Sequence, residues 1–212
     1  CKNKSVSRKI ATAVNYLIDN IYGEKAKWDD AIKFIVNGFS LPLTPENAIT
    51  VGNAVFLLSK SFNVIEDDII GGIDVLVEGF NRFFKEGSID IKAGSCEAIC
   101  EILCGYLNKK AKKKFREFIF QMLQTLLECL NANDSDNLKC VLFAVSDLAQ
   151  NEPTYLKKHF ADIFVLMGKI YEKRDLDGDA VRTISFEIIL TLVENIKNLL
   201  DKDKTNTLMT SI

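Results

Sequence analysis

The sequence has little proline, a single histidine and no long apolar run, and each shortage excludes a class of protein. Its three prolines are Pro42, Pro45 and Pro153. Each stands where we expect a helix to begin, a position that tolerates proline because its missing N–H has no partner to lose. A His-dependent catalytic triad would have to use His159, which lies in a predicted helix without a nucleophile in a recognisable turn. No apolar run approaches about 20 residues, which argues against a membrane span.

The chain also lacks an excess of charge of either sign. Its 212 residues include 27 basic and 29 acidic ones, for a net charge of −2. Nucleic-acid binding generally needs a strongly positive field, so we expect no direct contact with nucleic acid. Hydrophobic residues make up 48% of the chain, which allows a large core and argues against disorder.

The six cysteines are a poor layout for a disulfide framework. Cys96, Cys100 and Cys104 follow one another at a spacing of four and share one face of a predicted helix. No Cys-x-x-Cys pair or nearby histidine completes a tetrahedral metal set, so we expect neither a metal nor a cofactor. These three are interpreted as small buried residues at a tight helix contact, with free thiols in a reducing compartment.

Apolar residues recur at steps of three and four along almost the whole chain. This spacing fits the helical period of about 3.6 better than the strand period of 2 and predicts about nine helices. The stretches between them are short, so we see no domain boundary. Gly71 and Gly72 fall inside a predicted helix and do not form a phosphate-binding loop.

Every second predicted helix begins at a comparable place. The starting points are Ser5, Pro45, Ile89, Asp136 and Asp179, at intervals of 40, 44, 47 and 43 residues. HEAT and armadillo repeats have periods of about 40–47 residues. One helix pair cannot bury its own apolar face, whereas stacked pairs form a continuous core. The predicted fold is therefore all-α: a right-handed α-α superhelix, or HEAT-repeat solenoid, of helices in antiparallel pairs.

We expect a single repeat array over residues 1–212. It would consist of a half repeat at 5–22 and repeats at roughly 27–62, 66–107, 111–150 and 153–200. The first helix has no upstream partner, so the chain is interpreted as a fragment of a longer one. Bases in the first turns of alternate helices are expected to pair with turn acids between neighbouring repeats; they are Arg8, Lys92, Lys139 and Arg182.

Several stretches resemble the importin-β (karyopherin) family of nuclear transport receptors, most closely its beta-three, Ran-binding type. Residues 152–160 resemble a tyrosine-leucine-basic-x-histidine segment that opens an outer helix, and residues 182–194 resemble the inner helix that follows. Arg8-Lys9-Ile10, followed by Trp28, Lys33 and Phe34, matches two earlier repeats in order and spacing. The resemblance spans roughly residues 5 to 200.

The resemblance implies a segment from the N-terminal third of a transport receptor, in the cytoplasm, the nucleus and the nuclear pore. Its partners would be Ran-GTP, basic cargo proteins and Phe-Gly nucleoporins. The alternative is a HEAT or armadillo scaffold with no transport role, such as a phosphatase or condensin regulatory subunit. A helical enzyme would need a cleft with titratable partners, which we do not find, so we expect no enzymatic activity.

Candidate binding residues fall into three groups, each with a structural alternative. Acids off the apolar stripes of inner helices would attract lysine-rich cargo, or else form a solvated face; they are Glu97, Glu101, Asp147, Glu187 and Glu194. A basic run would meet an anionic partner, or else lie in a solvated loop; it comprises Lys109, Lys110, Lys112, Lys113, Lys114 and Arg116. Phe84 and Phe118 would line slots for Phe-Gly motifs, or else belong to the core.

One further segment is similar to a calcium-binding loop but departs from its pattern. Residues 175–179 read Asp-Leu-Asp-Gly-Asp, yet Ala180 and Phe186 occupy the positions where an EF-hand needs glycine and glutamate. We interpret the segment as an interhelix turn with a capping aspartate.

Overall fold

The computed structural model describes residues 4–23, 28–173 and 178–195, and within these ranges it contains helices and no strand. Nine of the described α-helices have twelve residues or more, which is the number expected from the apolar spacing. The α-helices are α1 (Lys4–Gly23), α2 (Asp29–Ser40), α3 (Ala48–Ile69), α4 (Ile73–Glu86), α5 (Ile89–Cys104), α6 (Lys109–Arg116), α7 (Ile119–Ala132), α8 (Ser135–Asn151), α9 (Pro153–Leu156), α10 (Phe160–Glu172) and α11 (Gly178–Asn195).

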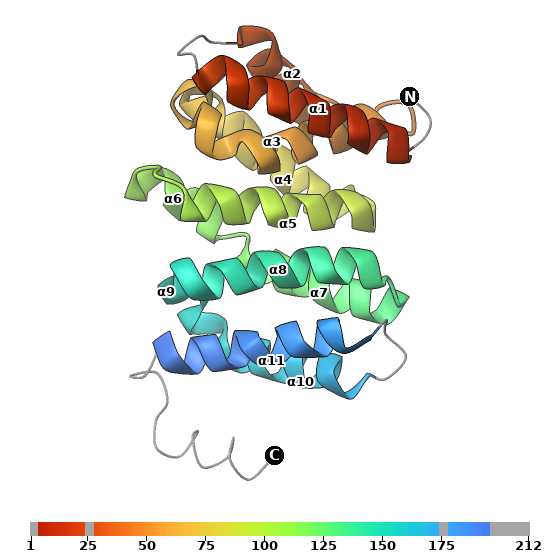
Figure 1. Cartoon of the computed structure of the whole chain (residues 1–212), viewed down its shortest axis with the longest axis vertical. Helices are drawn as coiled ribbons and strands as arrows, with labels where there is room; N and C mark the ends of the chain where they lie inside the picture. The colour runs from red at the N-terminus through yellow and green to blue at the C-terminus, as the bar shows by residue number, and fades with distance from the viewer. Residues whose placement is uncertain (1–3, 24–27, 174–177, 196–212) are drawn as a thin grey trace.

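The helices form two rows in a single stack (Figure 1). In the inner row, α1, α3, α5, α8 and α11 each pack against the next. In the outer row, α2, α4, α7 and α10 lie behind them, with the short α6 and α9 at the turns between rows. Stacked antiparallel helix pairs are the architecture of an α-solenoid, so the all-α fold prediction is confirmed.

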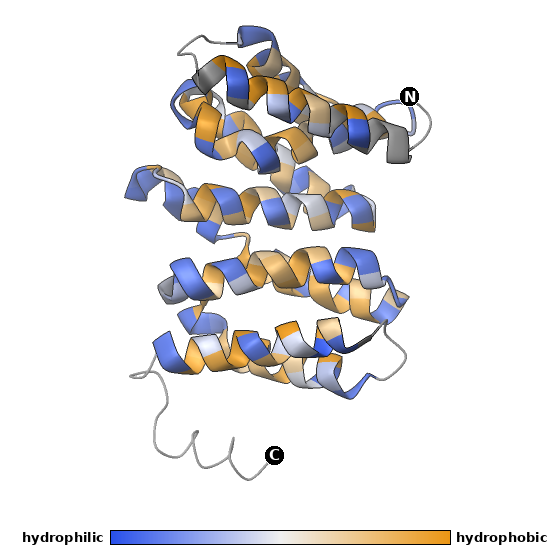
Figure 2. Ribbon diagram, in the orientation of Figure 1, coloured by the Kyte–Doolittle hydropathy of each residue, from blue (hydrophilic) through white to orange (hydrophobic). Residues whose placement is uncertain are grey.

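One continuous core fills the space between the two rows. Every helix alternates hydrophobic and hydrophilic residues along its length (Figure 2), as amphipathic helices do. The ring of Phe80 lies near the centre of an aromatic group, with centroids 4.9 Å from Phe39, 6.1 Å from Phe115 and 5.8 Å from Phe118. These edge-on contacts join α2 and α4 to the end of α6 and the residue that precedes α7, and they add to the free energy of apolar burial.

Two glycines allow neighbouring helices to approach closely. A Cβ at Gly38 would lie 2.3 Å from the Cβ of Ala54, where α2 meets α3. A Cβ at Gly79 would lie 2.5 Å from the ring of Phe39, where α4 meets α2. Both distances are far below van der Waals contact, so these helix pairs need glycine at the crossing.

Polar contacts between repeats join residues about one repeat apart. Arg82 donates to the carbonyl of Phe39, and Lys173 donates to the carbonyl of Leu130, 43 residues away in each case. Both carbonyls belong to the last turn of an outer helix, where carbonyls lack intrahelical partners and cations are favoured. Equivalent outer helices are thus held by equivalent contacts, as the repeat predicts.

The expected pairing of first-turn bases with turn acids of neighbouring repeats is wrong for two of them. The Nζ of Lys92 lies 2.7 Å from a carboxylate oxygen of Glu128 on the outer helix α7. Arg182 pairs within its own first turn with Asp179, at 2.5 Å. The side chain of Lys92 is largely buried and points towards the outer row. It therefore points away from the acids of the interhelix turns.

Several predicted helix boundaries also need correction. Gly71 and Gly72 lie in a 3-10 turn that joins α3 to α4, and not inside an α-helix. The third helix begins at Ala48 and not at Pro45, because Thr44 accepts from the N–H of Asn47 in a turn at 3.0 Å. Pro153 opens α9 as expected.

The stretch Ala48–Glu86 is long and apolar enough to cross a membrane by length and composition alone, although the sequence contains no apolar run of that length. Half of its most apolar window is buried inside the protein, and the 3-10 turn interrupts it. Packing between the two rows therefore accounts for its apolar character, and this single stretch is weak evidence for a membrane span.

Candidate partner-binding surfaces

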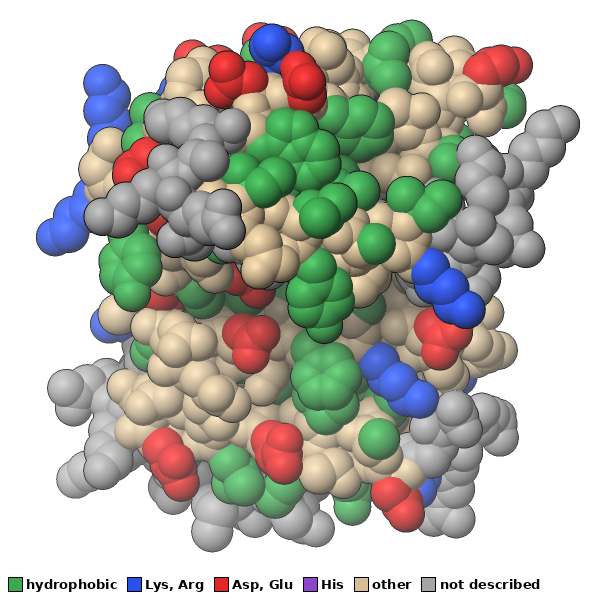
Figure 3. Space-filling model, turned by 45° about the horizontal axis from the view of Figure 1, so that its top comes forward, with side chains coloured by type: hydrophobic (Ala, Val, Ile, Leu, Met, Phe, Trp, Pro, Cys, Tyr) green, Lys and Arg blue, Asp and Glu red, His purple; other side chains and the backbone are tan. Residues whose placement is uncertain are grey.

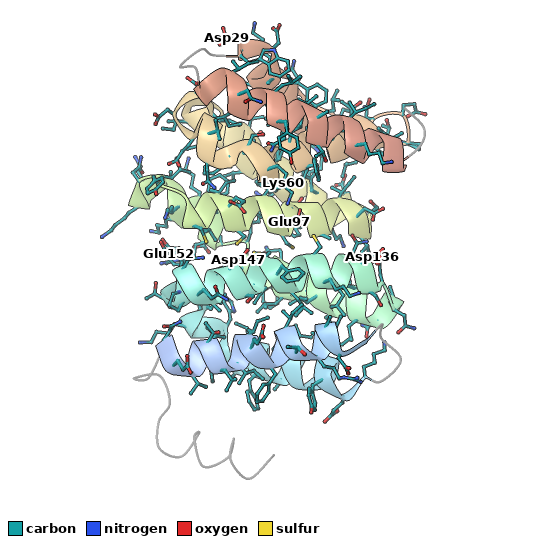
Figure 4. The ribbon with its side chains drawn as sticks, in the orientation of Figure 1. Asp29, Lys60, Glu97, Asp136, Asp147 and Glu152 are labelled. Carbon is teal, nitrogen blue, oxygen red and sulfur yellow. The ribbon has the colours of Figure 1, made fainter. Side chains whose placement is uncertain are left out.

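The first candidate surface lies on the solvent face of the inner row. Lys60 of α3, Glu97 of α5 and Asp147 of α8 project from this face (Figure 4). The Nζ of Lys60 lies 3.8 Å from a carboxylate oxygen of Glu97. Glu101, one turn further along α5, accepts a hydrogen bond from the side-chain amide of Asn63 at 3.1 Å. We call Glu97, Glu101 and Asp147 the acidic cluster. Lys60 pairs directly with Glu97 and acts electrostatically on Glu101 and Asp147.

The acidic cluster holds more negative charge than Lys60 can neutralise. Partial burial raises the pKa of Glu101, and the nearby carboxylates of Asp147 and Glu97 raise it further, against the lowering effects of Asn63 and Lys60. Burial also raises the pKa of Asp147, again against the influence of Lys60. Carboxylates that are costly to ionise in this position favour the approach of a second cation.

A groove of about 450 Å³ lies beside the acidic cluster, between α3, α5 and α8. Ile49, Phe56 and Gly94 contribute apolar surface, and Asp90 and Asp136 stand at its acidic rim. Figure 3, which views the inner row obliquely from its α1 end, shows hydrophobic side chains down the middle of this face with charged ones at both sides. An extended peptide with apolar and basic side chains would meet complementary chemistry here.

The two remaining predicted acids, Glu187 and Glu194, are exposed on α11, the next helix of the inner row. They extend the acidic character of the row beyond the cluster. Sequence reasoning missed Lys60 and Asn63, because a lone base and an amide give no charge pattern. Their signal is positional, since both lie on the solvent face of α3 opposite Glu97 and Glu101.

The second candidate surface is the basic run in α6, and the structure separates its members. The side chain of Asn108 accepts from the N–H of Ala111 at 3.0 Å and so caps the helix. Lys109, Lys110 and Lys113 are exposed. Arg116 lies over the ring of Tyr155, 5.7 Å from its centroid.

Two lysines of this run already have partners within the protein. Lys112 is 9% exposed, and its Nζ lies 3.3 Å from a carboxylate oxygen of Glu152. Lys114 pairs with Asp74 of α4. Lys112 lies beside the buried Ala111 on the face of α6 that turns inward, so it points at the neighbouring repeat and away from solvent.

The third predicted group, Phe84 and Phe118, forms no open slot. The two rings stack on each other, with centroids 5.8 Å apart and an angle of 28° between their planes. Phe118 is only 3% exposed, so it belongs to the core. Each ring therefore occupies the stacking position that the phenylalanine of an incoming Phe-Gly motif would need.

Cys96 and Cys100 are buried as expected, whereas Cys104 is partly exposed. Burial raises the pKa of the Cys96 thiol, which keeps it protonated and unreactive. No group of three His, Cys, Asp or Glu side chains within the described ranges is placed to hold a metal ion. Residues 175–177 lie outside the described residues, so the turn expected there stays a prediction.

His159 is half-buried at the start of α10. Its ring stacks on Phe120 with centroids 6.4 Å apart, and burial lowers its pKa. The contact gives the imidazole a packing role between α7 and α10.

Comparison with known proteins gives a family and a fold. The sequence profile described as IPO5-like, TPR repeats matches residues 2–166. No curated protein matches the chain. Among solved structures, the Kap121p mutant D353K/E396K/D438K is similar with a TM-score of 0.69 and 17% identity, over 93% of this chain and 20% of that one.

Two complexes of Kap121p match this chain with the same coverage as the mutant. Kap121p bound to RanGTP has a TM-score of 0.65 and 17% identity, and Kap121p bound to Nup53p has a TM-score of 0.65 and 18% identity. Each match covers 93% of this chain, which spans only 20% of the length of Kap121p. At these identities the likeness shows the fold alone, and the matching profile over more than half of the chain supplies the family. The chain belongs to the IPO5-like family of helical-repeat proteins.

Proposed function

We propose that this chain is a section of a nuclear transport receptor whose inner row binds lysine-bearing segments of cargo proteins. The acidic cluster carries the proposal, because Lys60 pairs directly with Glu97 alone while Glu101 and Asp147 add two more carboxylates within its electrostatic influence. A lysine from an incoming segment would complete the neutralisation that Lys60 begins. Such charge complementarity speeds encounter and selects basic partners over acidic ones.

The groove beside the acidic cluster supports an extended segment as the ligand. Its apolar wall includes Ile49 and Phe56, and Asp90 and Asp136 add negative charge at the rim. An extended chain places successive side chains on opposite faces. Alternate residues of a segment could therefore reach the carboxylates while others remain in solvent.

A binding assay with a matched control tests this proposal. A labelled peptide with three lysines spaced by small residues is titrated with the 212-residue chain, with anisotropy as the readout. The variant Glu97→Gln/Glu101→Gln/Asp147→Asn should weaken binding roughly tenfold, about 1.4 kcal/mol, and reduce its salt dependence. The control Glu78→Gln/Glu117→Gln/Glu172→Gln changes the net charge equally with exposed acids outside the inner row, and should stay within about twofold. An equal loss in both variants would reject the acidic cluster as the binding site.

The wider transport role belongs to the same proposal and includes no enzymatic activity. We propose that the parent protein is of the beta-three, Ran-binding type and moves between cytoplasm and nucleus through the nuclear pore. Ran-GTP and Phe-Gly nucleoporins are its further proposed partners. Structures similar to this chain support the proposal, since Kap121p has been solved bound to RanGTP and bound to Nup53p.

This wider role is tested with the parent protein, because transport receptors depend on many dispersed contacts. Pull-downs against Ran locked with a GTP analogue and against Phe-Gly peptides should both be positive. Two negative results would favour a scaffold outside nuclear transport.

A further inference from the structure

A second pocket lies at the edge of the stack, far along the inner helices from the groove. It has a volume of about 710 Å³ and forms where the end of α5 leads into α6, beside the start of α9. Figure 4 labels Glu152 at this edge. Its basic lining residues are Lys109, Lys112, Lys113 and Arg116.

The charge of this pocket is positive, although the chain as a whole is slightly negative. Glu152 is the one carboxylate in its lining, and it pairs with Lys112 at 3.3 Å. That pair leaves the charges of Lys109, Lys113 and Arg116 around the opening. Like charges that gather at a concave site, at a cost in mutual repulsion, favour an anionic ligand.

Arg116 has an aromatic neighbour inside the same pocket. Its guanidinium lies over the ring of Tyr155, 5.7 Å from the centroid, and both residues line the pocket. A cation–π contact of this kind restricts the guanidinium and leaves its N–H groups available as donors. A guanidinium can donate two parallel hydrogen bonds to a phosphate, with lysines neutralising the remaining charge. The hydroxyl of Thr154, at the start of α9, adds a donor at the rim.

We propose that this pocket binds a phosphoserine or phosphothreonine in a segment of a partner protein. A phosphate ester carries close to two negative charges and three acceptor oxygens, which matches three cations better than a single carboxylate does. A nucleic acid would need a basic track beyond the pocket, and the neighbouring Lys114 is already paired with Asp74. The site is separate from the acidic cluster, so the two proposals stand independently.

The test uses the 212-residue chain and three labelled peptides of one sequence, Gly-Ala-X-Ala-Gly, with X as phosphoserine, serine or glutamate. The phosphoserine peptide should bind at least about tenfold more tightly than the other two. Lys113→Gln/Arg116→Gln should remove this preference. Arg116→Lys should lose about half of the gain on a logarithmic scale, because it keeps the charge without the planar fork.

The matched control is Lys33→Gln/Lys169→Gln, which removes two exposed charges elsewhere and should leave the preference unchanged. Thermal unfolding of each variant separates lost binding from lost folding; an Arg116→Lys variant that melts like the original chain and keeps full affinity would overturn the role of Arg116. Equal binding of the three peptides, or equal loss in the control, would overturn the proposal. So would stronger competition by a single-stranded oligonucleotide than by the phosphoserine peptide.

Discussion

The side-chain amide of Asn137, near the start of α8, donates a hydrogen bond to Asp90, near the start of α5, at 2.9 Å. The same amide donates to Asp134 at 2.7 Å, and Asp134 in turn accepts from the N–H of Asn137 at 3.1 Å. One buried amide thus joins two successive inner helices and orients the residue that caps the second.

Replacing this amide should therefore weaken the stack. We expect Asn137→Ala to lower the free energy of unfolding by about 1–3 kcal/mol, because Asp90 and Asp134 each lose the hydrogen bond from this side-chain amide. Urea denaturation measures the change. Asn131→Ala, at an exposed position of α7, should stay within about 0.5 kcal/mol of the original chain. Equal stabilities for the two variants would contradict the assigned contact.

Two helical glycines should respond in opposite ways to the same substitution. Gly38→Ala would place its Cβ 2.3 Å from that of Ala54, and overpacking of this kind costs about 1–3 kcal/mol. A Cβ at Gly168 in α10 would meet no atom within 4 Å, so Gly168→Ala should stabilise the fold by about 0.5–1 kcal/mol. Thermal unfolding should show a lower melting temperature for Gly38→Ala and a higher one for Gly168→Ala than for the original chain. A higher melting temperature for Gly38→Ala would show that α2 and α3 are less closely packed than described.

Two phenylalanines, two residues apart, should differ sharply in their contribution to stability. Phe118 is 3% exposed and stacked on Phe84, whereas Phe120 is 50% exposed. We expect Phe118→Ala to lower the free energy of unfolding by about 3–5 kcal/mol and Phe120→Ala to cost much less. Denaturant titration compares them directly. If Phe118→Ala kept full stability and weakened Phe-Gly binding, the binding role predicted from the sequence would replace the core role.

The acidic cluster should make stability depend on pH. The folded pKa of Glu101 is raised above its ordinary value of 4.5, chiefly by burial, so the folded state holds this proton more tightly than the unfolded chain does. Stability from this group is present below pH 4.5 and is lost as pH rises through the raised folded pKa. Glu101→Gln, which retains an oxygen for Asn63, should therefore stabilise the chain at pH 7, and the gain should shrink towards pH 4.

Urea titrations of both proteins at pH 4 and pH 7 measure that difference. Glu117→Gln, at an exposed position, provides the control and should show no such trend. A constant difference between Glu101→Gln and the original chain across this range would contradict the raised pKa. The same variant should bind the lysine peptide less well, so stability and binding would change in opposite directions.

Much of this fold follows from local sequence pattern. Apolar spacing of three and four predicts the helices, and residues of those stripes such as Leu58, Ile99 and Val145 are fully or almost fully buried. The near-constant offset between alternate helices predicts the stack, because equivalent helices must bury equivalent faces. Helix ends were less predictable: the helix expected around Gly71 is interrupted by a 3-10 turn that the spacing does not reveal.

The candidate surfaces were harder to predict, since the burial and pairing of their residues depend on side chains one repeat away in the sequence. Lys112 lies in a run of lysines, and its burial depends on Glu152, 40 positions later, which accepts a hydrogen bond from its ammonium group. Phe84 and Phe118 are close enough to stack, yet nothing local in the sequence pairs them. Lys60 and the acidic cluster meet across helices of different repeats, so charge pattern along one helix predicts only part of the site.

The ties described here join adjacent members of the stack, at separations such as 43 residues for Arg82 with Phe39 and 47 for Asn137 with Asp90. A force applied at one end must therefore be transmitted from each repeat to the next, and each interface between repeats can accommodate a small part of the strain by sliding of its packed helices. The molecule should behave as an elastic coil. Its curvature can increase or decrease to fit partner proteins of different size while every helix stays intact.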